Sequence, residues 1–424
     1  MIGRVKSNWA SVIMKRYRRT AASQYLVVVI IMVSVIGLGL LSAFLMSQVP
    51  FVDYFVIPWA AGRAWLLDGI NPYESSVIDE ASTSIQDSPY LANLPDSPVL
   101  TLPLLSLIFY LPFSLIPYTI SRVIWATLLS LCLGLIGIMS IRLVGWKIPA
   151  YQIFIAVSMF LFWLPGAGII LTGHLSPIII LLLLVGMQLV IDRQDTTAGL
   201  VLALTASSFP SSGLFLIILL IWSISRKRWS IISSFFSGFL FLSVISWLVF
   251  PTWFLSWLSL LFSTYSGWEW IHTPMMDFAA LLPGLSPSLS VFLHAIMGVY
   301  AIFLIISVVG KSDRAFIYNT FGILIITYFL HIQASTYYLV LVIPGMFLVF
   351  RYWYERWGSL GKILTWAFLI IISGGSWLLV NGNINFVTTH WIPLLSIGFP
   401  VLVLVGIIWI RWWAIRIPKL PFDV

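Results

Sequence analysis

Long apolar stretches alternate with short polar segments along this chain. The runs 25–48 and 363–380 approach or exceed the roughly 20 apolar residues that a helix needs to cross a bilayer, and many similar runs lie between them. A transmembrane β-barrel would instead show short segments of alternating hydrophobicity. The pattern therefore predicts an all-α polytopic membrane protein.

The positions of Lys and Arg predict how these runs cross. Cytoplasmic loops are enriched in basic residues. If every basic cluster is cytoplasmic, the apolar runs pair as outward and return crossings, twelve in all, with both termini in the cytoplasm. The clusters are Arg4–Arg19, Arg142/Lys147, Arg193, Arg226–Arg228, Lys311/Arg314, Arg351–Lys362 and Arg411–Lys419. We expect crossings at about 25–48, 118–142, 150–171, 175–191, 196–208 and 210–225, then six more, separated by breaks near Pro251, Gly310, His331, Arg351 and Asn381.

One apolar segment does not fit this alternation. Residues 98–117 contain four prolines, which interrupt helix hydrogen bonding, and a full crossing there would turn the later basic clusters outward. We therefore expect a re-entrant or outer-leaflet segment. The short runs around Pro210 are predicted to form a helical hairpin that enters protein or a cavity.

The resulting plan is a single integral membrane domain, 1–424. It has a cytoplasmic N-terminus (1–24), a first outer loop (49–117) with an amphipathic helix at about 53–68 and the re-entrant segment, and a second outer loop (251–282). We predict a multi-pass protein of the cell membrane whose active site faces outside.

Composition agrees with this assignment. The chain is 60% apolar and only 8% charged, whereas soluble domains are nearer half apolar and a quarter charged. The net charge of +8 reflects membrane orientation, so no nucleic-acid partner is expected. Basic residues precede the first apolar run, as in signal peptides, but that run is too long for a signal sequence and is predicted to be an uncleaved span. The lone Cys132 excludes an internal disulfide.

Acidic residues concentrate in the first outer loop, which holds seven of the fourteen in the chain. In this topology Arg63 and Arg122 are the only outer cations. The second outer loop carries Trp253, Trp257, Trp268, Trp270, Glu269, His272 and Asp277. Any chemistry is expected between these two loops.

Asp53 is the first charged residue after the first apolar run. It has two compatible interpretations. It is a preferred residue for capping the helix that follows, and a partly desolvated carboxylate at the membrane surface has a raised pKa that suits a general base. We expect it to stand without a neutralising partner.

Several other residues are candidates for binding. The stretch Asp68–Tyr73 first indicates a helix stop, with Gly69 in the left-handed position and a proline after it. Either Arg63 or Arg122 reaches lipid phosphate at the interface or grips a substrate phosphate through its planar guanidinium. His331 begins a polar segment at the outer end of a span. Two interpretations of His331 are equally favoured: contact with a sugar or phosphate, and simple solvation at the membrane interface.

The sequence gives no sign of a metal or cofactor. The five histidines have no metal-ligand spacing, and the outer loops lack the Asp-x-Asp or Asp-x-Glu pair that commonly chelates a cation with a diphosphate. There is also no phosphate-binding glycine loop, so nucleotide-driven transport has no support.

The order of several short motifs resembles family 87 glycosyltransferases. Asp53-Tyr54, followed by Ala60/Ala61, Leu66/Leu67 and Gly69-Ile70-Asn71-Pro72-Tyr73, resembles the first outer loop of that family. Further similarity lies in Ser97-Pro98-Val99-Leu100, the Leu111–Pro117 segment, Trp125, Gly173-His174-Leu175-Ser176, the segment 198–229 and, thinly, residues 337–344. The chain departs from the family pattern at Phe209, where lysine is usual, at His174, where glutamine is usual, and at Tyr337-Tyr338, which replace a histidine-bearing site.

The resemblance implies a GT-C superfamily enzyme, typified by polyprenol-phosphate-mannose-dependent mannosyltransferases. It implies that Asp53 is the catalytic base and that a sugar, such as mannose, passes from a polyprenyl-phosphate donor to a hydroxyl of a glycolipid or cell-envelope glycan. One carboxylate base with a preformed leaving group favours inversion, and the absence of an acidic chelating pair favours a metal-independent reaction. Membrane lipids are the other expected partners. Candidates for binding the donor phosphate or the substrate are Arg122, Arg63, His174, His331, Tyr337, Tyr338, Asp68 and Tyr73.

Two other classes compete with this interpretation. A transporter or flippase of a lipid-linked or polar substrate also fits twelve crossings, but transporters place ionisable residues within broken helices near the bilayer midplane. A polysaccharide polymerase or ligase would use outer arginines and a large late loop. This chain instead concentrates its charge in the first outer loop.

Overall fold

The computed structural model describes residues 32–95, 100–264, 273–282, 284–331, 336–377 and 392–414. The described residues are 82% helical and their only sheet is a two-residue ladder, which confirms the all-α membrane fold. Several sequence features lie outside the described residues: the basic N-terminus, Pro98, Trp268, Glu269, Trp270, His272, the Asn381 break and the last basic residues.

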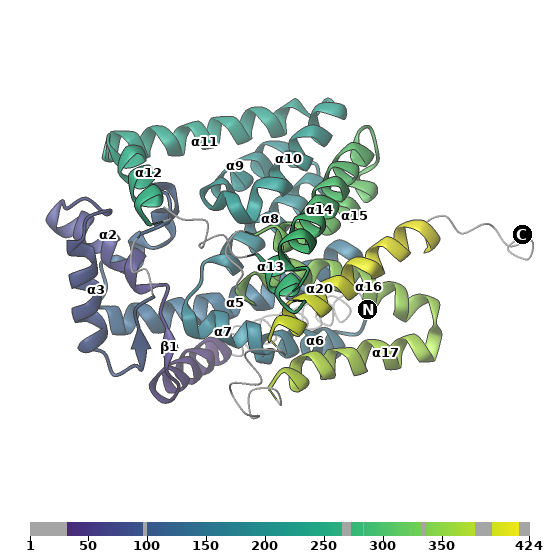
Figure 1. Ribbon diagram of the computed structural model, residues 1–424, viewed down its shortest axis with the longest axis horizontal. Helices are drawn as coiled ribbons and strands as arrows, with labels where there is room; N and C mark the ends of the chain where they lie inside the picture. Colours follow the sequence, from purple (N-terminus) through teal and green to yellow (C-terminus); the bar gives the residue numbers. More distant parts are fainter. Residues whose placement is uncertain are drawn as a thin grey trace, which may run out of the picture.

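The first outer loop is built from short elements between two long helices (Figure 1). The helix Met32–Gln48 precedes it. The elements of the loop are β1 (Phe51–Val52), α2 (Val56–Asp68), α3 (Ser76–Gln86), β2 (Ala92–Asn93), the 3-10 helix η1 (Leu104–Phe109) and α4 (Leu111–Ser114). The segment 100–117 thus holds only a six-residue and a four-residue helix, both too short to cross a bilayer.

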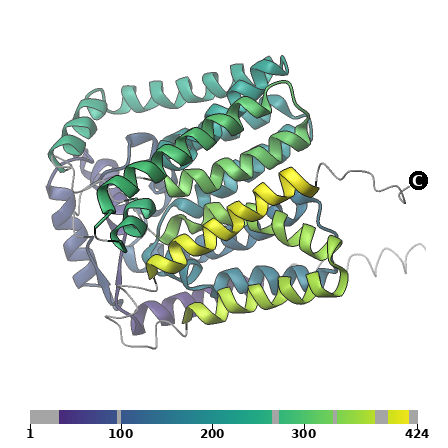
Figure 2. The same cartoon turned by 45° about the vertical axis from the view of Figure 1, so that its right-hand side comes forward.

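The remaining chain forms the body of helices. Its elements are α5 (Tyr118–Val144), α6 (Ala150–Phe162), α7 (Leu164–Thr172), α8 (Ser176–Ile191), α9 (Asp195–Thr205), η2 (Ala206–Ser208), α10 (Phe209–Ser225), α11 (Trp229–Val249), α12 (Trp253–Thr264), α13 (Pro274–Ala280), α14 (Ser286–Val308), α15 (Asp313–Phe329), η4 (Thr336–Val342), α16 (Ile343–Arg356), α17 (Gly358–Ile370), the π-helix η5 (Ile371–Gly375), α20 (Ile392–Trp409) and the π-helix η7 (Ile410–Ala414). The long helices run side by side across the molecule (Figure 2).

Six helical runs among the described residues are long and apolar enough to cross a membrane, and α6 with α7 makes a seventh if their 60° bend is one broken span. The bend follows from Pro165, which cannot continue the hydrogen bonding of α6. Four further apolar helices, including α8 and Met32–Gln48, have only 10–17 residues. Among the described residues, six or seven helical runs thus have the length and composition of a full crossing, and the twelve crossings stay a prediction.

The run Asp195–Ser225 is one of those six by composition, yet it folds back on itself. Arg228, just beyond α10, donates to the carboxylate of Asp195 at the start of α9, so the two helices are antiparallel. The turn lies at η2, where Ser212 Oγ donates to the Thr205 carbonyl oxygen at 2.7 Å. Residues around Pro210 therefore form a helical hairpin.

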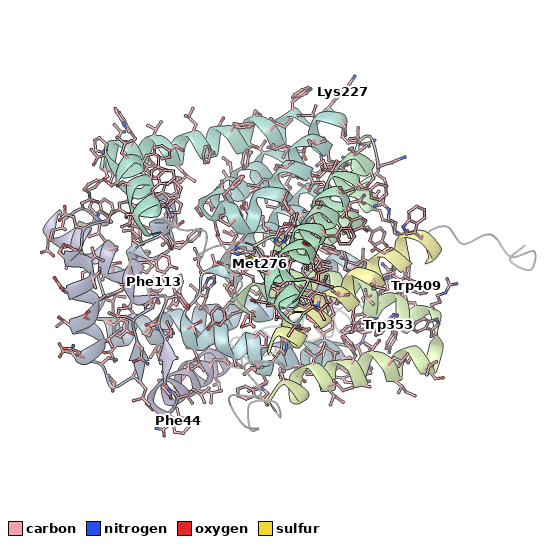
Figure 3. The ribbon with its side chains drawn as sticks, in the orientation of Figure 1. Phe44, Phe113, Lys227, Met276, Trp353 and Trp409 are labelled. Carbon is pink, nitrogen blue, oxygen red and sulfur yellow. The ribbon has the colours of Figure 1, made fainter. Side chains whose placement is uncertain are left out.

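The loops of the body gather at two opposite ends. At one, which we call the basic end, Arg193 pairs with Asp313 at 3.0 Å and Trp222 Nε1 donates to the Lys311 carbonyl oxygen. Because the helices alternate in direction, the residues that join their other ends meet at the opposite side, which we call the site end. Figure 3 shows Lys227 and Trp409 toward the basic end and Phe113 toward the site end. The charge pattern of the sequence thus matches a physical separation in the fold.

Helix α2 differs from the amphipathic surface helix that was expected at 53–68. It begins at Val56, and eight of its thirteen residues are buried, including Trp59, whose Nε1 donates to the carbonyl oxygen of Phe113 at 3.0 Å. Its end matches the predicted stop, since Gly69 has φ of +67° and its amide closes onto the Trp65 carbonyl. The helix packs between α3 and α4 within the first outer loop.

Candidate active site

Asp53 is held at the site end by the β1–β2 ladder. Phe51 pairs in parallel with Ala92, and the Asp53 amide donates to the Asn93 carbonyl oxygen at 2.9 Å. The side-chain Oδ1 accepts the amide of Phe55 at 2.9 Å, which closes the turn before α2. Asp53 therefore fixes the entry to α2 from two residues upstream of its cap position.

The other carboxylate oxygen of Asp53 faces the start of α5. Its Oδ2 accepts the Tyr118 hydroxyl at 2.5 Å and Arg122 Nε at 3.0 Å. Tyr118 and Arg122 are four residues apart and so lie on one face of α5. The Asp53 and Arg122 side chains both have zero exposed fraction. This is a fully buried ion pair.

The rest of the Arg122 guanidinium points at the last turn of α7. Its Nη2 donates to the carbonyl oxygens of Ile170 and Leu171, while its Nη1 is buried without a hydrogen-bond partner. An unpaired buried guanidinium N–H is costly and thus unusual. The position beside Asp53 therefore retains one donor that no described group uses.

Gly173 allows this close approach. It has φ of +73°, and a Cβ there would lie 2.8 Å from Phe55 Cβ, 3.2 Å from Asp53 Oδ1 and 3.3 Å from Arg122 Cζ. The Gly173 carbonyl accepts Trp125 Nε1 at 2.8 Å. A glycine is required here because both the backbone angle and the space exclude a side chain.

A cluster of aromatic rings adjoins the pair, with members from four chain segments. We call it the site cluster: Tyr54, His174, His331, Tyr337 and Tyr338. The His174 ring lies 5.8 Å from Tyr54, 5.6 Å from Tyr337 and 4.9 Å from Tyr338, and Tyr338 stacks on His331 at 3.6 Å. Tyr54, next to Asp53, is 39% exposed and connects the buried pair with the surface.

His174 is neutral in this setting. Its Nδ1 accepts the amide of Ser176 at 3.2 Å, which places the proton on Nε2. Burial and, to a smaller extent, the neighbouring His331 together lower the pKa of His174 from 6.5 to about 3. The ring therefore presents an N–H donor at neutral pH without a positive charge.

The structure brings together most of the candidates from the sequence. Asp53 and Arg122 are paired, and His174, His331, Tyr337 and Tyr338 share the site cluster. The expectation that Asp53 stands without a neutralising partner is wrong, because Arg122 neutralises it. Arg122 itself is buried rather than exposed at the interface, because its guanidinium is drawn to Asp53 and two backbone carbonyls.

The other three candidates lie apart. Arg63 pairs with Glu80 at 3.3 Å on the partly exposed face of α2. Asp68 is an exposed residue at the end of that helix. Tyr73 donates its hydroxyl to the Leu102 carbonyl at 3.2 Å, and burial raises its pKa. None of these contacts connects the three to Asp53.

Two contributors were not singled out from the sequence. Tyr118 contacts the Asp53 carboxylate directly, and its spacing of one helical turn from Arg122 was the available signal. Ser211, whose Oγ lies 3.4 Å from His331 Nε2, follows the Pro210 break and carried no distinct signal. Among the described residues no group of three or more His, Cys, Asp or Glu could hold a metal ion.

These features define a polytopic helical membrane protein with a buried carboxylate–guanidinium pair beside a polar aromatic cluster at one end. The sequence profile of glycosyltransferase family 87 matches residues 101–317, half of the chain. The chain belongs to that family and is a glycosyltransferase. Family membership favours an enzyme over the transporter alternative.

The matched region covers Arg122 and His174 but begins after Asp53 and ends before His331. Neither the curated proteins nor the solved structures gave a match. The family therefore establishes glycosyl transfer, while the donor, the acceptor and the role of Asp53 rest on the site itself.

Proposed function

We propose that this glycosyltransferase moves a sugar from a polyprenyl-phosphate donor to a hydroxyl of a glycolipid or cell-envelope glycan at the outer membrane face. The observation that carries the proposal is the convergence of Asp53, Arg122 and the site cluster at the end of the molecule opposite the basic loops. Basic loops favour the cytoplasm, so the site end is assigned to the outside.

The proposed reaction is a direct displacement. The acceptor hydroxyl oxygen bonds to the anomeric carbon, the bond from that carbon to the phosphate oxygen breaks, and the hydroxyl proton moves to Asp53. The polyprenyl phosphate leaves with the bonding electron pair. A single base and a preformed leaving group correspond to inversion, by analogy with single-displacement glycoside chemistry. Mannose is our first choice of sugar.

The Arg122 Nη1 and the neutral His174 Nε2–H are the proposed donors to the leaving phosphate. Nη1 is a buried donor without a partner, and the tautomer of His174 directs its proton away from Ser176. Hydrogen bonds to developing negative charge are strong in a site from which water is excluded. Tyr337 and Tyr338 are proposed to contact the donor sugar from the same cluster.

Asp53 has no exposed surface in this conformation, so the proposal includes a movement that uncovers it. Catalytic hydrogen bonds often become productive only when substrate is bound, and unliganded geometry does not disqualify a base. Tyr54 is the neighbouring side chain that reaches the surface, and we propose that its displacement opens the path to the carboxylate.

The test is a donor-release assay with purified protein in lipid nanodiscs. Polyprenyl-phosphate mannose, glucose and a pentose are offered in turn, and free polyprenyl phosphate is measured with and without a crude glycolipid acceptor. We expect acceptor-dependent release with one donor, and the product should have the inverted anomeric configuration. No release with any donor would refute the lipid-phosphate assignment.

The base is tested separately because the Asp53→Asn change also disturbs a buried ion pair. The double variant Asp53→Asn/Arg122→Met removes both charges and provides a stable reference. We expect both variants to lose about 10²–10⁴-fold in turnover, the usual contribution of a general base. Near wild-type turnover in either variant would remove Asp53 from the base role.

A further inference from the structure

A hydroxyl-lined cleft lies between α12 and the first outer loop. It has a volume of about 400 Å³ and is lined by Asn71, Tyr73, Ser256, Ser259, Leu260 and Ser263. The three serines are spaced by three and four residues, so they lie on one face of α12. Figure 1 shows α12 on the same side of the molecule as α2 and α3.

Side chains from both walls of the cleft donate hydrogen bonds to the neighbouring carbonyl groups of Thr101 and Leu102. Trp257 Nε1 of α12 donates to the Thr101 carbonyl oxygen at 2.9 Å. From the other wall, the Tyr73 hydroxyl donates to the Leu102 carbonyl oxygen at 3.2 Å. A smaller cavity of about 220 Å³ shares Tyr73 and Leu260 and extends the cleft toward α3. Both walls of the cleft are thus hydrogen-bonded to the same segment of chain.

The lining offers hydrogen-bond groups of both kinds. Ser259 and Ser263 donate to the carbonyl oxygens of Ser256 and Leu260, at 2.9 and 3.0 Å, so their hydroxyl oxygens are left to accept. Asn71 Oδ1 already accepts the Tyr73 amide at 3.0 Å, which leaves the amide NH₂ of Asn71 as a donor. The cleft therefore presents donors and acceptors side by side.

Charge narrows the class of ligand. None of the six residues that line the larger cavity is charged, and the described lining of the smaller one adds only Glu74. A phosphate or other anion would find no cation there. A neutral molecule with many hydroxyl groups matches this lining, and the volume is within the range of ordinary small-ligand sites.

The cleft connects with the candidate active site through a short piece of chain. Leu102 leads into η1, and Tyr110 at its end lies with its ring 5.9 Å from that of Phe55, which follows Asp53 by two residues. The segment that borders the cleft therefore packs directly against the start of α2, next to Asp53.

We propose that this cleft binds a neutral oligosaccharide, the part of the acceptor beyond the hydroxyl that receives the new sugar. The inference rests on the proposed function in one respect, that the acceptor is a carbohydrate. The cleft is a binding site separate from Asp53 and supplies affinity and acceptor choice rather than chemistry.

Site-directed labelling tests the proposal on the full-length protein. In a Cys132→Ala background, Ser259→Cys places one thiol in the cleft, and Thr83→Cys places one on the exposed face of α3 as a control. Maleimide labelling is followed with maltotriose, cellotriose or mannotriose at about 50 mM. At least fivefold slower labelling at position 259 alone is expected, which corresponds to a Kd of about 12 mM or tighter.

Adding Asn71→Ala to the Ser259→Cys variant should remove most of that protection. Equal effects at positions 259 and 83, no protection by any trisaccharide, or equal protection by inorganic phosphate would overturn the proposal. Protection is measured without a donor, so it is independent of the lipid-phosphate reaction. Donor release without protection would refute the oligosaccharide site alone, whereas protection without donor release would refute the proposed lipid-phosphate reaction alone.

Discussion

Replacing Arg122 by methionine tests whether the pair with Asp53 is as deeply buried as the structure shows. Both side chains have zero exposed fraction, and Arg122 Nε lies 3.0 Å from Asp53 Oδ2. Removing one partner of such a pair leaves an uncompensated buried charge and costs about 3–5 kcal/mol. The Tyr118 hydroxyl and the Phe55 amide still donate to the carboxylate in the variant. We therefore expect a loss near the lower limit, about 3 kcal/mol.

The Asp53→Asn change should also destabilise, because Arg122 then keeps only the Ile170 and Leu171 carbonyls as partners. In the double variant Asp53→Asn/Arg122→Met no charge remains, and asparagine retains an oxygen for the Phe55 amide. Replacing both members of a buried pair is often nearly neutral. The two single changes should thus be non-additive, with a coupling energy of about 2 kcal/mol or more.

The assay is unfolding in mixed detergent micelles by added dodecyl sulfate, followed by the fluorescence of the 21 tryptophans. The free energies of unfolding of the wild type, both single variants and the double variant complete the cycle. If the two single losses add to the double loss within about 0.5 kcal/mol, the residues do not interact and the buried pair is refuted.

Three further predictions concern packing and protonation. Gly173→Ala should lower both transfer activity and stability, whereas Gly69→Ala, which has a similar positive φ but no atom within 4 Å of its Cβ, should lower stability alone. The wild type should lose free energy of unfolding as the pH falls from 6.5, because only the unfolded imidazole of His174 binds a proton until about pH 3. The slope is at most about 1.4 kcal/mol per pH unit, the limit for one proton. The variant His174→Gln should lack this slope when unfolding is measured as a function of pH. Gly199→Ala should reduce the melting temperature, because the new Cβ would lie 2.5 Å from the Ile231 carbonyl oxygen. The control Gly298→Ala, in open space on α14, should raise the free energy of unfolding by up to about 1 kcal/mol. Equal shifts in the two variants would contradict the close packing of α9 against α11.

The sequence predicted which loops of the helical body share an end better than it predicted the length and continuity of individual helices. Basic residues such as Arg193 and Lys311 indicated which loops share an end, and the structure places these two together through Asp313 and Trp222. The positions of Lys and Arg are informative because they depend on which side of the membrane a loop lies, and not on the contacts of individual side chains. The length of a span is harder to infer, since a proline such as Pro165 bends a run that reads as continuous.

The candidate site was predictable where its residues lie at helix ends. His174 and His331 follow from the alternation of spans, which places both at the site end. The pairing of Asp53 with Arg122 was not predictable, because the residues are 69 positions apart and either side chain alone fits a surface location. Composition identified the charges, but only the 3.0 Å contact in the folded chain, which Gly173 permits, shows that they neutralise each other.

The two-residue β1–β2 ladder has a consequence for how such a loop can vary. Because Phe51 and Val52 pair with Ala92 and Asn93, the two ends of the intervening segment 53–91, the excursion, are joined to each other as well as to the helical body. Residues inserted into or deleted from α3 would change the reach and the surface of that excursion while its base stayed fixed. Related chains could therefore adapt this region to different glycans without relocating the carboxylate that follows β1.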